Sequence, residues 1–238
     1  MNIQDLIIKD KEQVFLQDVF LKEGNRQQIE QLIKEHLYID ELRKLGLPVS
    51  NKMLLFGHSG CGKTTTAKAI SNSLGKPLII LNLSNIVNSK IGETSQNVKQ
   101  VFDRAVRDKA VLFLDEFDQL GKARGADDHD VGEMRRLVNS IIQQIDYLPE
   151  DVLLICATNH VDIIDSALIR RFQIRIQYEM PTQDELDDFY DNLLQRFPEE
   201  LHPKARQYGL SFAEAKDNLF LIVKSNLIKK LEMKGRVL

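Results

Sequence analysis

The sequence predicts an α/β fold, with a five-stranded parallel sheet flanked by helices and a small all-helical domain after it. Short apolar runs alternate along the chain with segments whose apolar residues recur every three or four positions. The runs are almost uninterrupted, which is typical of strands that are buried on both faces of a parallel sheet. After Pro181 the runs stop and only the helical periodicity continues.

Length and composition set the limits of this fold. The chain has 238 residues, 43% of them hydrophobic and 28% charged, which is enough to bury a sizeable core. The formal net charge of −3 argues against a nucleic-acid or membrane-surface partner. Cys61 and Cys156 are expected to be reduced thiols. The polar start predicts no signal peptide, and no apolar run reaches the roughly 18 residues of a membrane span. These features predict a cytoplasmic protein.

The predicted elements follow in order along the chain. Residues 1–25 have no strong period, and apolar residues from Ile29 onward predict a helix that ends near Gly46. The five predicted strands cover residues 53–56, 78–81, 111–114, 152–156 and 174–178. Between them, helices are expected over residues 63–74, 98–106 and 131–145. Polar clusters that follow these strands should converge, because ligands of such sheets bind beyond the carboxyl ends of the strands.

The last part of the chain is expected to be helical throughout. Thr182 and Glu185 have the spacing of a capping box, and an amphipathic helix should follow and stop at Pro198. A final helix is predicted from apolar residues that recur every fourth position over 219–231. The predicted domains are therefore an N-terminal helical segment at 1–46, a core at 47–180 and a small all-helical domain at 181–238.

A phosphate-binding loop joins the first strand to its helix. Residues 57–64 match the pattern G-x-x-x-x-G-K-[ST] between a strand and a helix, which is the context that this motif requires. Backbone amides and the helix N-terminus should hold the phosphates of a nucleotide, Lys63 should reach the β- and γ-phosphates, and Thr64 should bind Mg²⁺. A chance glycine-rich turn is the alternative. The predicted nucleotide-binding residues are Gly57, His58, Ser59, Gly60, Cys61, Gly62, Lys63, Thr64 and Thr65.

Two acids end the third strand. Asp115 is suited to the Mg²⁺ shell and Glu116 to polarising an attacking water, because phosphoryl transfer depends on positioning and charge neutralisation. The alternative is that both acids merely end a strand at the surface. Asp118 is expected to be a surface residue. His58 and Cys61 occupy variable positions of the loop, and no chemistry is expected of them.

Polar residues after the fourth strand complete the predicted site. Asn159 could orient the water or contact the γ-phosphate. Residues 159–162 faintly match the guanine signature N-K-x-D, but the lysine is missing, so GTP is a weaker alternative. Arg170 and Arg171 follow. Two adjacent arginines before Phe172 could be a solvated basic pair, could form an ion pair with a surface acid, or could act as an arginine finger that stabilises transition-state charge. A finger supplied in trans requires a neighbouring subunit.

The order of these segments closely resembles the AAA ATPase family over about residues 50–178, and the helical tail looks like the family's lid. The resemblance implies ATP with Mg²⁺, a homo-oligomeric and commonly hexameric ring, and a protein substrate or partner. It implies sensor 1 for Asn159 and the finger for Arg170 and Arg171. The sequence departs from the family at Lys90, where an aromatic residue usually stands, and it lacks an obvious sensor-2 arginine.

The expected function is therefore ATP hydrolysis coupled to remodelling or unfolding of a protein partner. Two alternatives stay open at this point: a nucleic-acid-loading ATPase, and a switch in which the bound nucleotide gates a partner with little turnover. The acidic composition weighs against the first, and Lys90 leaves room for the second.

Overall fold

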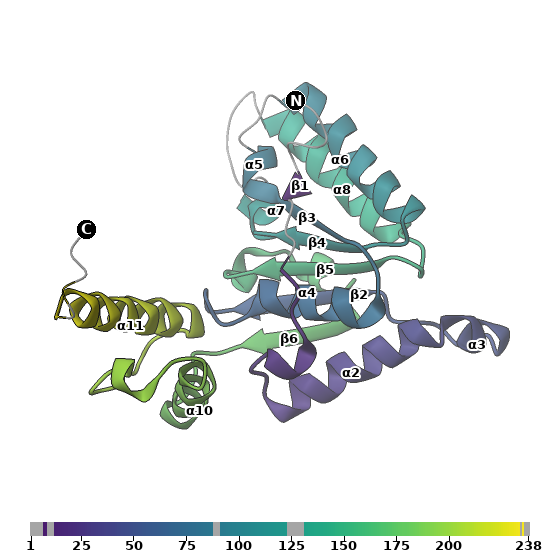
Figure 1. The fold of residues 1–238 in the computed structure, drawn as a ribbon. Coiled ribbons are helices and arrows are strands. Elements are labelled where there is room, and N and C mark those ends of the chain that lie inside the picture. The colour runs from purple at the N-terminus through teal and green to yellow at the C-terminus, as the bar shows by residue number, and fades with distance from the viewer. Residues whose placement is uncertain (1–6, 9–11, 88–90, 123–130, 234, 236–238) are drawn as a thin grey trace. The chain divides into compact units, whose positions relative to one another are not determined.

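A computed structural model describes residues 7–8, 12–87, 91–122, 131–233 and 235 (Figure 1). The chain forms two compact units. The first comprises Met1–Gly57 and Lys63–Gln177, and the second comprises His58–Gly62 and Tyr178–Leu238.

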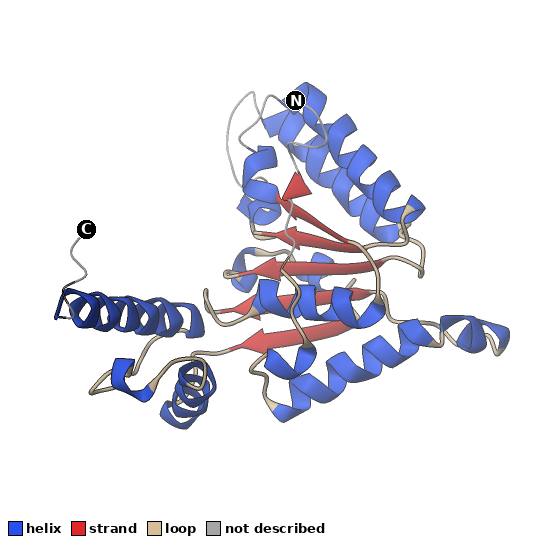
Figure 2. Cartoon of the chain, viewed as in Figure 1, coloured by secondary structure: helices blue, strands red, loops and turns tan. Residues whose placement is uncertain are grey.

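The first unit alternates strands with helices as predicted (Figure 2). Its elements begin with β1 (Ile7–Ile8), η1 (Leu16–Asp18), α2 (Glu23–Leu37), α3 (Ile39–Lys44), β2 (Lys52–Gly57), α4 (Lys63–Leu74), β3 (Leu78–Asn82), α5 (Leu83–Val87) and α6 (Ile91–Arg107). They continue with β4 (Val111–Asp115), α7 (Gln119–Lys122), α8 (Val131–Asp146), β5 (Leu153–Thr158), η2 (Val161–Ile163), α9 (Ser166–Ile169) and β6 (Ile174–Tyr178), whose last residue belongs to the second unit.

The strands form one sheet in the order β1-β3-β4-β5-β2-β6. The pairs β3–β4, β4–β5 and β2–β5 are parallel, so the predicted parallel sheet is confirmed. β1 is an additional edge strand, antiparallel to β3, with Ile7 opposite Leu81 and Ile8 opposite Ile80. The sequence did not indicate it because two residues are too few to establish an alternating pattern.

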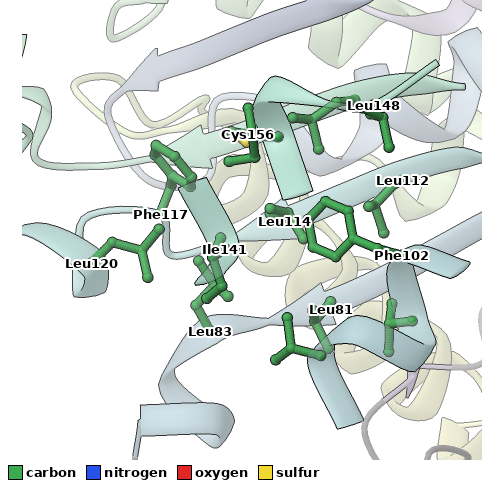
Figure 3. Close-up of a cluster of buried hydrophobic side chains, with 14 of the residues drawn as sticks. Leu81, Leu83, Phe102, Leu112, Leu114, Phe117, Leu120, Ile141, Leu148 and Cys156 are labelled. Atoms are coloured by element: carbon green, nitrogen blue, oxygen red, sulfur yellow. The ribbon is translucent and has the colours of Figure 1, made fainter. Parts of the chain in front are cut away.

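The largest hydrophobic cluster lies between the sheet and the helices α6 and α8. Because side chains alternate along a strand, Leu112 and Leu114 of β4 both point to this face, and Cys156 of β5 joins them (Figure 3). Phe102 of α6 and Ile141 of α8 cover them (Figure 3). Burial raises the pKa of the Cys156 thiol well above its ordinary value, in keeping with a reduced core residue.

Helix α4 covers the opposite face of the sheet and packs against β4 and β5, and α2 packs on α4 (Figure 1). The intervening residues of the same strands, such as Phe113 and Ile155, are fully buried but belong to no part of the α6–α8 cluster. The sheet is therefore buried on both faces, which explains the continuous apolar runs of the sequence.

The second unit contains α10 (Gln183–Leu194), η3 (Glu199–Leu201) and α11 (Phe212–Met233). The predicted capping box is present, because the Thr182 side chain accepts from the Glu185 amide and the Glu185 side chain from the Thr182 amide. Leu186 and Tyr190 of α10 pack with Leu219 of α11 in a small core. No helix of the described residues is both long and apolar enough to cross a membrane.

Candidate active site

Glycines give the phosphate loop its backbone conformation. Gly57, Gly60 and Gly62 have φ angles of 123°, 72° and 105°, in the region that side chains strongly disfavour. These conformations let successive amides turn toward one side of the loop, which is how such loops bind anions. The glycines of the motif are therefore required by the backbone.

Residues 58–62 of the loop are fixed by other parts of the second unit. The Ala213 amide donates to the Gly60 carbonyl at 3.1 Å, and the His58 amide to the Tyr178 carbonyl at 3.1 Å. A Cβ atom on Gly60 would lie 2.5 Å from the Ser211 Oγ. The Cys61 side chain is buried, and its Sγ donates to the Ser59 carbonyl at 3.6 Å. The loop is thus held mainly through its backbone.

Lys63 begins α4 directly after the loop, within the first unit. Its side chain is 8% exposed and its Nζ donates to the Gly57 carbonyl at 2.7 Å. A buried ammonium needs such acceptors, because an unpaired buried charge is very unfavourable. Thr64 is half-buried and Thr65 is exposed.

Asp115 and Glu116 lie where β4 ends, and each is held by a neighbour. The Glu116 amide donates to the Asp115 Oδ1 at 2.9 Å, and the Ser84 hydroxyl donates to the Glu116 Oε2. Glu116 has a φ of 55°, which is rare for a residue with a side chain and is concentrated at functional sites. Ser84, at the start of α5, was missed by the sequence analysis because nothing in its local pattern marks it.

Burial raises the pKa of Asp115, and the negative charges of Glu116 and Asp118 raise it further. The backbone hydrogen bond from Glu116 and the positive charge of Lys63 act in the opposite direction. These effects place Lys63, Glu116 and Asp118 within electrostatic range of Asp115. A carboxylate whose charge is poorly solvated gains from a nearby cation, so the environment of Asp115 fits a magnesium ligand.

The described residues contain no group of three or more His, Cys, Asp or Glu side chains that could hold a metal ion. This does not conflict with magnesium at Asp115 and Thr64, because Mg²⁺ at nucleotide sites is held by one or two protein ligands together with phosphate oxygens and water.

The expectation that Asp118 is a surface residue is wrong. Its side chain is only 4% exposed, and its Oδ1 accepts a hydrogen bond of 2.9 Å from the Thr158 hydroxyl. The Thr158 hydroxyl in turn accepts from the His160 amide at 2.9 Å. An acid just past a strand end suggests solvent, but here the neighbouring strand β5, distant in sequence, covers it.

The polar residues after β5 differ in how they are held. Asn159 is exposed, and so is Arg170, whose guanidinium makes no hydrogen bond or ion pair with another described residue. Arg171 is anchored: its Nε and Nη2 contact the two carboxylate oxygens of Asp146 at 2.7 and 3.1 Å, and its Nη1 donates to the Ala167 carbonyl at 2.7 Å. This ion pair raises the pKa of Arg171. Lys90 lies outside the described residues.

A parallel sheet, a glycine loop with a lysine at the start of the following helix, and two acids at the end of another strand of the same sheet define a P-loop nucleotide-binding protein. The sequence model of the AAA family, "ATPase family associated with various cellular activities", matches residues 53–180. The chain therefore belongs to the AAA family of ATPases, and ATP hydrolysis is the activity of that family.

Named relatives agree with this assignment. An uncharacterized AAA family ATPase, y4kL of Sinorhizobium fredii, is 34% identical over 90% of this chain and 65% of its own length. The peroxisomal ATPase pex1 of Schizosaccharomyces pombe is 36% identical over 74% of this chain. A putative ribosome biogenesis ATPase, nvl, of Dictyostelium discoideum is 31% identical over 76%. The chain spans only 19% and 22% of the last two proteins.

The fold also matches a solved structure. The crystal structure of the FIGL-1 AAA domain superposes with a TM-score of 0.67 at 24% identity, covering 81% of this chain and 64% of that one. At this level of identity the match concerns the fold alone, and it agrees with the predicted sheet with flanking helices and a helical region after it.

Proposed function

We propose that this chain hydrolyses ATP with Mg²⁺ in a homo-oligomeric, six-membered ring in the cytoplasm, and that hydrolysis drives the remodelling or unfolding of a protein partner. The observation that carries the proposal is the cluster at the end of β4, where Lys63 and Asp115 influence each other electrostatically and Glu116 adopts a left-handed backbone conformation. Such strain is retained where the chemistry needs a side chain in one orientation.

The proposed roles follow from charge and position. The amides of residues 57–62 and the Lys63 ammonium would bind the phosphates, as in other P-loops. Thr64 and Asp115 would hold the Mg²⁺, which neutralises charge on the phosphate oxygens when bound. Glu116 would accept a hydrogen bond from the attacking water and orient it. Asn159 would contact the γ-phosphate or this water.

The arginine pair supports a ring. The exposed Arg170 carries a charge that no described residue of its own chain pairs, so it is suited to reach the nucleotide of a neighbouring subunit. Arg171, the second proposed finger residue, would have to leave Asp146 to do the same, and until then it orients the turn that presents Arg170.

The relatives named as ATPases favour ATP over GTP, and the net charge of −3 favours a protein partner over nucleic acid. We propose the domain division 1–46, 47–180 and 181–238, with the last part acting as the lid of the nucleotide site.

Replacing Glu116 by Gln tests the proposal. The variant should bind ATP but hydrolyse it at least about 10²-fold more slowly, because the group that activates the water is neutral. Rings should persist in ATP by native mass spectrometry, and protein partners trapped on them can be identified after copurification. Glu41→Gln, a change of the same kind at an exposed position of α3, is the control. Hydrolysis by Glu116→Gln at the wild-type rate, or none by the wild type, would contradict the proposal.

A further inference from the structure

Two segments of the first unit, separated by about forty residues in sequence, are fastened together along their length. The acid segment, residues 115–121, contains Asp115 and Glu116 and leads into α7. The sensor segment, residues 157–163, contains Asn159 and leads into η2. The proposed function assigns catalytic work to the exposed or half-buried side chains of both segments, but no role to the residues that join them.

The joining contacts occur at successive positions. The Phe117 amide donates to the Ala157 carbonyl at 2.8 Å. One residue further on, the buried Thr158 hydroxyl donates to the Asp118 carboxylate at 2.9 Å. The Phe117 ring points into the core (Figure 3) and packs edge-on against the Phe172 ring, with 5.5 Å between the ring centroids. Two contacts, one between backbone groups and one between side chains, thus fix one segment against the other, and the ring contact fixes Phe117 against Phe172.

Gly121 extends the contact to the end of α7. A Cβ atom at this position would lie 2.4 Å from the Ile163 carbonyl oxygen, so the backbones of the two segments approach as closely as a glycine permits. The two segments therefore have one relative position, with little space for adjustment.

We propose that Asp118 and Thr158 are positioning residues, whose buried hydrogen bond sets Asn159 relative to Glu116 for ATP hydrolysis. The Thr158 hydroxyl is both a donor and an acceptor. It donates a hydrogen bond to the Asp118 carboxylate and accepts one from the His160 amide at 2.9 Å. Asn159 lies between these two bonded residues. Its backbone is therefore fixed by the same hydroxyl that connects β5 to the acid segment, two residues beyond Glu116.

A role in stability alone explains this pair less well. A buried charge makes a poor stabiliser, because desolvation offsets most of what its hydrogen bonds contribute, and well-packed apolar residues often serve as well or better. A buried carboxylate and hydroxyl form a directional hydrogen bond, which fixes the relative orientation of the two segments. Two apolar side chains do not fix orientation in this way. Catalysis depends on the position and orientation of the reacting groups, since a misplacement of about 1 Å can lower a rate about 10²-fold.

Thr158→Val and Thr158→Ser test this inference, which rests on the proposed function. Valine keeps the shape of threonine but removes the hydroxyl, so kcat should fall about 10- to 100-fold while the Kd for ATP stays within about twofold. Serine keeps the hydroxyl and should restore most of kcat. Amide hydrogen exchange of the peptide containing His160 should be faster in Thr158→Val and unchanged in Thr158→Ser, independently of any hydrolysis.

Each other outcome overturns a definite statement. If Thr158→Val keeps the wild-type kcat while Glu116→Gln abolishes hydrolysis, the positioning role is wrong and the proposed function stands. A loss of ATP affinity as large as the loss of kcat would indicate general damage and would also overturn the inference. If the wild type fails to hydrolyse ATP, the proposed function is wrong and the positioning role with it.

If Thr158→Val does not fold, the same question can be asked from Asp118. Asp118→Asn keeps an oxygen that accepts from Thr158 and should retain most of kcat, whereas Asp118→Leu has a similar volume without an acceptor and should lose it. Equal kcat values for these two variants, measured on folded protein with unchanged ATP affinity, would overturn the inference.

Discussion

The phosphate loop and the acid segment supply the two halves of the proposed chemistry, but they are held in place in different ways. Within its unit, the loop is fixed through backbone groups, with the Gly60 carbonyl bonded to the Ala213 amide and the His58 amide to the Tyr178 carbonyl. The acid segment has one such backbone bond, from the Phe117 amide to the Ala157 carbonyl, but it is also fixed through side chains, namely Asp118 to Thr158 and Phe117 to Phe172.

This difference determines which residues can vary. In the loop, most side chains should be replaceable and the glycines should not, because the amides do the binding. In the acid segment, side chains with no direct part in the chemistry should matter nearly as much as those that perform it. Four tests by substitution extend this comparison, from the largest expected effect to the smallest.

The first test concerns the two arginines that precede Phe172, the residue whose ring packs against Phe117 of the acid segment. Arg170→Ala should lower ATP turnover by about 10³-fold or more with ATP affinity nearly unchanged, because a finger acts on the transition state. Arg171→Ala should also destabilise the fold slightly, because it leaves the half-exposed Asp146 without its bidentate partner. Steady-state ATPase assays and thermal melts of both variants measure these effects.

A mixing experiment shows whether Arg170 acts in trans. Arg170→Ala and Glu116→Gln subunits should each hydrolyse ATP very slowly alone, but in mixed rings a Glu116→Gln subunit would present its Arg170 to a site that retains Glu116. Part of the turnover should return on mixing. If mixtures of two assembled variants stay inactive, Arg170 does not act across the subunit boundary.

The second substitution adds one methyl group to the loop. Gly60→Ala should weaken ATP binding about tenfold or more, because alanine at a φ of 72° is strained by about 1–3 kcal/mol and its Cβ would meet the Ser211 Oγ at 2.5 Å. Gly75→Ala is the matched control, since Gly75 has a φ of 61° with open space around it. Titration with a fluorescent ATP analogue measures both. Equal affinities in the two variants would mean that backbone conformation at Gly60 does not control binding.

The third substitution tests the environment of Asp115. Because burial raises the pKa of this carboxyl, the folded protein holds the proton more tightly than the unfolded chain does. The free energy of unfolding of the wild type should therefore fall as the pH rises from the ordinary aspartate range through the raised pKa of Asp115. The Asp115→Asn variant should not show this decrease. Without nucleotide and metal, the variant should melt at a higher temperature than the wild type at neutral pH, and the two curves should converge in acid.

Magnesium provides the control for this third prediction. Mg²⁺ with ATP should raise the melting temperature of the wild type more than that of Asp115→Asn, because only the carboxylate binds the ion strongly. A variant that is less stable than the wild type at neutral pH in the absence of metal would contradict the assigned environment.

The fourth substitution should do least. Cys61→Ala removes a buried thiol whose Sγ donates a weak hydrogen bond to the Ser59 carbonyl, and the substitution leaves the loop backbone in place. ATP affinity and turnover should stay within about twofold of the wild type. A larger loss would show that loop side chains matter as much as those of the acid segment, and the comparison would fail.

The sequence predicted those parts of the molecule that local chemistry determines. The helix over residues 63–74, the strand over 174–178 and the capping box of Thr182 and Glu185 agree with the structure. The positions of the phosphate loop, Asp115 and Glu116 could be predicted for the same reason, since each follows an apolar strand in a recognisable local pattern.

Contacts between distant segments could not be predicted in this way. Asp118 looks like a solvent-exposed acid in its own segment, and only the placement of β5 beside β4 brings the Thr158 hydroxyl to it. The same holds for Ser84 and Glu116, and for Ile7 and Ile8, whose strand depends on the free edge of β3. In each case the structure depends on a contacting residue from a distant part of the chain, which the local sequence does not specify.

The short strand β1 has a practical consequence for work with this protein. Its two residues occupy hydrogen-bonding positions along β3, which would otherwise lie open at the margin of the sheet. A truncated protein that starts at residue 12, or a bulky tag fused close to Ile7, would expose the edge of β3. An exposed edge strand can pair with a strand of another molecule. Precipitation or mixed aggregates in such preparations would then report a cloning artefact rather than ring assembly.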